Sequence, residues 1–91
     1  MSDTVRNNAG EHRYELVVDG HVAAAHYTLQ PGTITFVHTV VPEALGGRGV
    51  GSALARGALD DARAQGLKVV PQCPFIAGYI KKHPEYADLV A

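Results

Sequence analysis

The sequence is poor in several features that define common classes of protein. Among its 91 residues only Cys73 is a cysteine, which excludes an internal disulfide framework and fits a reducing cytoplasm. The formal net charge of -1 creates no field that would hold nucleic acid or an anionic membrane. No apolar run is long enough to cross a bilayer, and residues 1–10 contain no signal-peptide core. We therefore expect a cytoplasmic protein with neither nucleic-acid nor membrane partners.

What is present is the composition of a folded globular protein, 46% hydrophobic and 19% charged. The length is enough for one domain with one modest core. We expect residues 1–10 to form a disordered tail and residues 11–91 to form the domain, as a monomer or weak dimer. Four of the five histidines (His12, His21, His26 and His83) are scattered along the chain, and we predict no metal site.

The first half of the domain has the pattern of an antiparallel three-stranded meander. Two segments of alternating hydrophobicity flank Asp19-Gly20, a pair that tolerates the positive φ angles of a type I′ hairpin turn. Pro31-Gly32 suits a type II turn before a third strand over residues 33–41. Strict alternation on that third strand places four side chains on one face: Ile34, Phe36, His38 and Val40.

The second half predicts a helix over residues 49–65, a short fourth strand over 67–73 and a second helix over 74–83. Proline removes a ladder hydrogen bond, so Pro71 belongs where the fourth strand loses its partner and splays away from the third. On the first helix Arg56 and Asp60 are spaced to form an ion pair. The fold class is α/β (α+β) in one domain.

The entry to the first helix is the most unusual stretch of the chain. "GGRGVGS" places Gly47, Gly49 and Gly51 beside Arg48, although a glycine inside a helix costs about 1 kcal/mol relative to alanine. The stretch contains no carboxylate, which is the residue type that usually satisfies the free amides and positive dipole of a helix start. Glycines allow phosphate oxygens to approach backbone amides closely, and an arginine adds positive charge. We therefore predict an anion site here, although a merely flexible loop capped by Ser52 is the alternative.

Two common phosphate-binding motifs fit this stretch poorly. The P-loop needs a lysine where Ser52 stands. A dinucleotide fingerprint starting at Gly47 or Gly49 has its third glycine position at Ser52 or Leu54, and no acidic residue follows the next strand to bind a ribose.

"GGRGVGSALARGALDDAR" instead resembles the acyl-coenzyme A pyrophosphate loop of the GNAT-type N-acetyltransferase superfamily. Gly49 and Gly51 match its two small positions, while Gly46 replaces the usual Arg or Gln. "HTVVPEALGGRGVGSALA", "GLKVVPQCPF" and "YIKKHPEYADL" are similar to a compact single-domain subfamily of GNAT-like proteins. The resemblance covers about residues 10–90 and implies a truncated GNAT-like fold that binds acetyl-CoA.

The resemblance also implies how the ligand is held. The coenzyme's pantetheine lies where the third and fourth strands diverge, paired with the backbone of Thr39, Val40 and Val41. Its pyrophosphate lies on the loop residues, which are Gly47, Arg48, Gly49, Val50, Gly51 and Ser52.

Acetyl transfer needs a neutral amine and a proton for the departing thiolate. The family's tyrosine acid falls on Ile80 here, and Tyr79 is turned away by about 100°. Cys73, at the predicted N-terminus of the second helix, is a candidate acid or acyl carrier, because a helix dipole favours the thiolate; a small buried hydrophobe is the alternative. His38 is a candidate base, or else a hydrogen-bonded core residue.

Two functions remain open from the sequence. The first is an acetyl-CoA-dependent N-acyltransferase that acts on an unidentified amine, either a small molecule or a protein amine. The second is a non-catalytic acetyl-CoA-binding module, a sensor or adaptor with a degenerate transferase site, which the isoleucine at position 80 favours.

Overall fold

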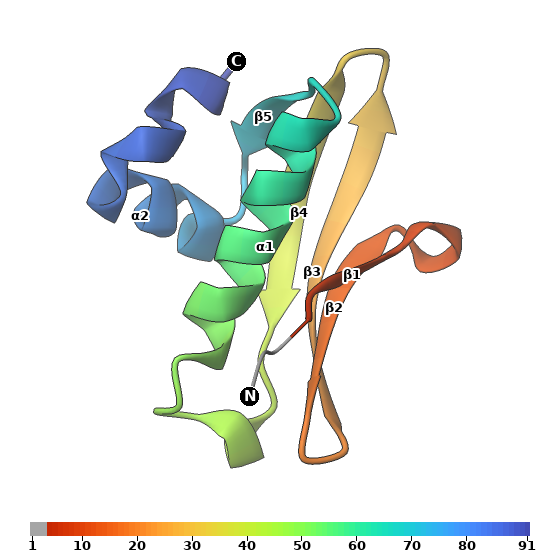
Figure 1. Cartoon of the computed structure of the whole chain (residues 1–91), viewed down its shortest axis with the longest axis vertical. Helices are drawn as coiled ribbons and strands as arrows, with labels where there is room; N and C mark the ends of the chain where they lie inside the picture. Colours follow the sequence, from red (N-terminus) through yellow and green to blue (C-terminus); the bar gives the residue numbers. More distant parts are fainter. Residues whose placement is uncertain (1–3) are drawn as a thin grey trace.

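The computed structural model describes residues 4–91 and contains one five-stranded sheet (Figure 1). The strands lie side by side in chain order, and the first four pair antiparallel. The last strand pairs parallel to its neighbour, as a crossover through a helix requires. The predicted meander and α/β class are confirmed. The strands are β1 (Arg6–Asn8), β2 (Arg13–Val18), β3 (His21–Gln30), β4 (Thr33–Val40) and β5 (Lys68–Pro71).

Both predicted turns of the meander have the expected backbone. Asp19 and Gly20 have φ angles of 50° and 77° between β2 and β3, as a type I′ hairpin requires. Gly32 has a φ of 74° between β3 and β4, as the third residue of a type II turn does.

The helices pack against one face of the sheet. The two α-helices, α1 (Val50–Ala64) and α2 (Pro74–Lys82), agree with the predicted bounds to within a residue. α1 lies across β2 and β3, and α2 lies beside it against β4 and β5 (Figure 1). One hydrophobic core joins them, in which Leu54, Leu59 and Ile76 are fully buried. Within residues 4–91 the chain also forms three short 3-10 helices: η1 (Ala9–Glu11), η2 (Glu43–Leu45) and η3 (Pro84–Leu89).

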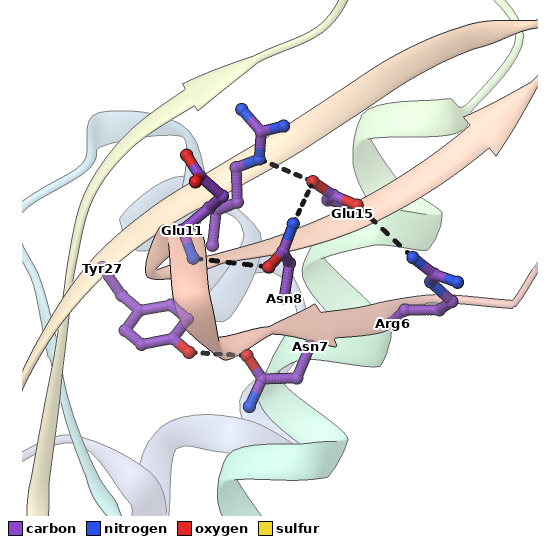
Figure 2. Close-up of polar contacts among 7 residues, drawn as sticks. Arg6, Asn7, Asn8, Glu11, Glu15 and Tyr27 are labelled. Carbon is purple, nitrogen blue, oxygen red and sulfur yellow. Dashed lines mark hydrogen bonds and ion pairs between the residues drawn. The ribbon is translucent and has the colours of Figure 1, made fainter.

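The prediction of a disordered tail is wrong for residues 6–10, whereas residues 1–3 lie outside the described part. Arg6–Asn8 forms β1 and pairs with β2. The buried carboxylate of Glu15 accepts hydrogen bonds from Asn8 Nδ2 at 3.0 Å and Arg13 Nε at 2.6 Å (Figure 2). These contacts hold the pKa of Glu15 below its usual value. A charge that is buried in this way needs such partners, and Glu15 of β2 therefore stabilises the position of β1, which supplies Asn8.

Contacts with two further elements hold β1 in place. Tyr27 Oη donates to Asn7 Oδ1 at 2.5 Å (Figure 2). Val5 lies over α1 at Gly57, where an added Cβ would stand 2.5 Å from the valine side chain. The absence of a side chain at Gly57 therefore allows the N-terminal segment to pack on the helix.

The side-chain alternation of β4 changes at a β-bulge. His26 pairs with His38 while its neighbour Tyr27 pairs with Phe36, so Val37 is an extra residue on β4. The insertion moves His38 to the face opposite Phe36, where its side chain is exposed. The predicted placement of His38 on the Ile34 and Phe36 face is therefore wrong, because strict alternation holds only while each residue has one partner.

Candidate functional site

The glycine loop, residues 41–49, connects β4 to α1 and depends on two left-handed glycines. Gly47 and Gly49 have φ angles of 75° and 71°, a conformation that is unfavourable for any residue with a Cβ. No atom lies within 4 Å of the place where either Cβ would stand. Glycine is thus required at both positions by the path of the backbone, and the space beside it stays open.

The N-terminus of α1 has no side-chain cap. Gly49 is the N-cap and has no side chain to accept from the first turn, and no acidic residue occurs in that turn. The first amides of a helix have no intrahelical acceptor and carry its positive dipole. Beside them is a hollow of about 270 Å³, and its lining residues are Val41, Leu45, Gly46, Gly47, Gly49, Val50, Gly51, Ser52 and Phe75. This arrangement can bind an anion through backbone donors.

Gly51 has a different reason to be glycine. A Cβ at this position would stand 2.8 Å from Cζ of Phe75, so the aromatic ring lies directly against the backbone of α1. Phe75 is nevertheless 43% exposed and forms one wall of the hollow.

The structure directs the charge of Arg48 away from the hollow. Its Nη1 lies 2.6 Å from Oδ2 of Asp19 in the β2–β3 turn, and the arginine holds the pKa of that carboxyl below its usual value. Arg48 does not line the hollow. It ties the glycine loop to the hairpin, so the positive charge that we expected it to place beside an anion is already paired.

The strand opening lies next to the loop. β5 pairs with β4 only as far as Pro71, which is opposite Phe36, and Cys73 N then donates to Phe36 O at 2.8 Å. Pro74 starts α2, so the chain turns away from the sheet. Residues 37–40 of β4 have no partner on β5, and the predicted splay is confirmed. Thr39 and Val40 lie in this unpaired part, and Val41 lines the adjoining hollow.

Cys73 lies where the two strands separate. It is the N-cap of α2, as predicted, and only 3% of its surface is exposed. Its Sγ lies 3.2 Å from Oγ1 of Thr39, so the two groups can share a proton across the opening. The thiol belongs to the hydrophobic core cluster and has one polar partner on β4.

His38 is separated from Cys73 by the sheet. Its ring stacks with that of His26 on the helix-free face, with centroids 6.2 Å apart. Because Thr39 contacts Cys73 on the helix side, adjacent residues of β4 serve opposite faces at the opening. The two predicted catalytic side chains are therefore not neighbours.

The sequence analysis did not predict that three residues lie together at the site, namely Arg56, Lys82 and His83. With Ser52 and Tyr79 they line two further hollows between α1 and α2, next to the glycine loop. Tyr79 stacks on His83 with centroids 4.1 Å apart, and burial raises the pKa of its hydroxyl. The signal was available in the four-residue spacings from Ser52 to Arg56 and from Tyr79 to His83, which place each pair on one helix face.

Two classes of feature are not found within residues 4–91. No group of three or more His, Cys, Asp or Glu side chains in this range is arranged to hold a metal ion. No helix in this range is long and apolar enough to span a membrane.

Comparisons with known proteins agree with this architecture. A sequence model described as GCN5-related N-acetyl-transferase matches residues 13–89. A GCN5-like protein from Staphylococcus aureus, solved by NMR, superimposes with a TM-score of 0.73 at 28% identity. That alignment covers all of this chain and 91% of the other.

Curated relatives match part of the chain. Protein NATD1 of Xenopus tropicalis is 38% identical over 52 residues, which cover 57% of this chain and 48% of that protein. Protein NATD1 of Homo sapiens is 43% identical over 47 residues, which cover 52% of this chain and 42% of that protein. The chain thus spans about half the length of these relatives.

Proposed function

The chain belongs to the GCN5-related N-acetyltransferase family, and from this we propose that it binds acetyl-CoA and transfers the acetyl group to an amine. The observation that carries the proposal is the open, uncapped start of α1 beside the unpaired part of β4. The first feature suits a pyrophosphate, and the second suits the amide groups of a pantetheine arm. The free thiol of Cys73 fits a reducing compartment, so we also propose a cytoplasmic location.

The proposed ligand extends from the loop into the strand opening. Amides of residues 47–51 bind the pyrophosphate, and the backbone of Thr39, Val40 and Val41 pairs with the pantetheine. The thioester then lies close to the contact between Thr39 and Cys73. We propose that the acetyl group lies in the gap between β4 and β5, where residues 37–40 have no partner on β5, so that the amine approaches it from the helix-free face on which His38 lies.

The chemistry joins the amine nitrogen to the acetyl carbon and breaks the carbon–sulfur bond. The amine must lose a proton and the departing thiolate must gain one. We propose that His38 accepts the first proton, because the bulge places its imidazole on the exposed face.

We propose that Cys73 serves the other half of the reaction, with its thiol held by Thr39. In a direct transfer the thiol gives its proton to the thiolate of CoA. In a relayed transfer Sγ attacks the acetyl carbon, CoA leaves with the cysteine proton, and the amine then displaces Sγ. Mass spectrometry of the protein incubated with acetyl-CoA alone distinguishes the two, because only the relay leaves an acetyl group on Cys73.

A binding assay with a matched control tests the ligand site. Gly49 and Gly66 have nearly equal φ angles, 71° and 72°, and both have open space at the Cβ position. Gly49→Ala and Gly66→Ala therefore carry a similar backbone cost of about 1–2 kcal/mol. Calorimetry with acetyl-CoA should show a loss of affinity of at least about tenfold for Gly49→Ala only. Equal affinities in both variants, or no binding to the unmodified protein, would refute the site.

Turnover separates the enzyme from a non-catalytic acetyl-CoA-binding module. The burial of Cys73 and the isoleucine at position 80 favour this second candidate. Release of CoA thiol is measured with a panel of small amines and peptide amino termini. The enzyme should acetylate at least one amine, and His38→Ala and Cys73→Ala should each lower kcat. Tight binding without turnover on any amine would identify the binding module instead.

A further inference from the structure

The helix-free face of the sheet carries a row of basic side chains. Arg13 of β2 pairs with His26 of β3, and His26 pairs with His38 of β4. In each of these strands the next residue faces the helix side, so all three side chains lie on the opposite face. We call these three residues the basic row. Adjacent strands are about 4.8 Å apart, so the row spans about 10 Å from β2 to β4.

The N–H groups of the basic row are available to a ligand. Arg13 donates through Nε to Glu15 at 2.6 Å, and within residues 4–91 its two Nη groups have no acceptor. Neither imidazole makes a side-chain hydrogen bond or an ion pair in the same range. The arginine side chain is 32% exposed, and His38 is exposed as well. The row can therefore donate to a carboxylate that approaches from solvent, and Arg13 can do so through both Nη groups.

The carboxylate of Glu15, which lies on the same face, is already paired. It accepts hydrogen bonds from Asn8 and Arg13, and Arg6 Nη2 lies 3.9 Å from its Oε1 (Figure 2). Only 9% of its side chain is exposed, so it offers no site for an ammonium group. The pairing with two arginines leaves a net positive charge around this carboxylate. A substrate with a negative group suits this surface better than one with a second cation.

Apolar side chains continue the same face beside the basic row. Ala24 pairs with Val40, and Val17 pairs with Val22 at the next position on that face. The three valines are exposed. The surface next to His38 can therefore contact the aliphatic part of an acceptor while the row binds its charged part.

We propose that the acceptor is an aminocarboxylate, in which a carboxylate lies within one or two residues of the reacting amine. The carboxylate binds Arg13 and His26, and the nitrogen faces His38. This inference rests on the proposed function, in which His38 accepts the proton of the amine. Two sources present these groups: a free acidic amino acid, and a peptide amino terminus whose second residue is acidic. A two-residue peptide spans roughly 7 Å, which suits the distance along the row.

Two matched pairs of acceptors test the inference through the rate of CoA release. The first pair is Ala-Glu-Ala amide and Ala-Gln-Ala amide, which differ only in a carboxylate. The second pair is free glutamate and free glutamine. In at least one pair the acid should have a kcat/KM at least about tenfold above that of its amide, because the charge-assisted contacts to Arg13 and His26 are lost in the amide. A preference in the first pair identifies a peptide terminus as the source, and a preference in the second pair alone identifies a free amino acid.

Variants of the basic row should change this ratio rather than turnover alone. Arg13→Gln and His26→Gln should each lower the acid-to-amide ratio several-fold, and Arg13→Lys, which keeps the charge, should retain part of it. A general loss of stability cancels, since both acceptors are measured on the same protein. Lys81→Gln is the matched control, because it removes a charge from an exposed position on α2, on the other side of the sheet.

The outcomes separate this inference from the proposed function. Turnover with equal kcat/KM for acid and amide in both pairs, or a ratio that Arg13→Gln and Lys81→Gln change alike, would overturn the inference while acetyl transfer stands. If no amine is acetylated, the proposed function fails, and NMR titration of the peptide pair still tests the row. Shifts of the His26 and His38 imidazole signals with the Glu peptide alone would support it, and equal or absent shifts would overturn it.

Discussion

The two ends of α1 are built from opposite kinds of contact. At the C-terminal end Asp61 accepts hydrogen bonds from Tyr14 Oη and Gln65 Nε2, both at 2.5 Å. Arg63 pairs with Asp88 at 2.8 Å, and Gly66 closes the helix with a φ of 72°. At the N-terminal end no side chain caps the helix and the first turn contains no acid. One end satisfies its own polar groups and serves as scaffold, while the other leaves donors free for a ligand.

A substitution at the C-terminal, scaffold end of α1 should cause the largest loss in the free energy of unfolding. Asp61→Ala removes the acceptor of the buried Tyr14 hydroxyl, whose pKa is raised by burial and by that carboxylate. A buried donor without a partner costs about 1–3 kcal/mol, and we expect urea unfolding to show a loss of that size. Acetyl-CoA affinity should not change. On a Tyr14→Phe background the same substitution should cost less, and equal costs on the two backgrounds would show that this hydrogen bond does not stabilise the fold.

A carboxylate placed at the open end should change stability and binding in opposite directions. Ser52→Asp adds an acid to the first turn of α1 and should raise the free energy of unfolding by about 0.3–1 kcal/mol through the helix dipole. The same charge should repel the pyrophosphate and weaken acetyl-CoA binding. Ala64→Asp is the control, because it puts that charge at the exposed last residue of α1. It should lower stability by a similar amount without affecting binding, and equal effects on affinity would contradict an anion site at the start of the helix.

The last prediction concerns stability at high pH near the scaffold end. Burial, and then the hydrogen bond to Asp60, raise the pKa of Tyr86 to about 12 from a usual value of 10. The folded protein thus retains a proton that the unfolded chain loses, so this contribution is complete below pH 10 and is lost as the pH rises to about 12. Tyr86→Phe should flatten the fall in thermal stability across this interval. An unchanged slope would mean that Tyr86 titrates alike in both states.

The sequence predicted correctly those elements that depend on residues close together in the chain. The Asp19-Gly20 turn, the bounds of α1 and the departure of β5 at Pro71 follow from φ preferences and proline chemistry, and all three are confirmed. The glycine loop was predicted from composition and resemblance. The roles assigned to its residues, and to His38 and Cys73, remain predictions.

The features that sequence reasoning missed depend on distant partners. β1 contains only Arg6, Asn7 and Asn8, which have no hydrophobic alternation, and its stability comes from Glu15 and Tyr27. Similarly, the pairing of Arg48 with a residue 29 positions earlier cannot be inferred from the loop itself. Long-range contacts of this kind become visible only when the register of the sheet is known.

Because of the bulge at Val37, the number of residues in β4 determines which face of the sheet its later side chains occupy. Deleting Val37 would not simply shorten the strand by one residue, because the residues after it would exchange faces. An imidazole that now meets solvent would point toward the helices, and the hydroxyl of Thr39 would leave the thiol of Cys73 for the open side. A deletion at this point therefore exchanges the two faces of the strand after it. Natural or engineered variants of the protein should tolerate substitution at Val37 far better than a change in the number of residues.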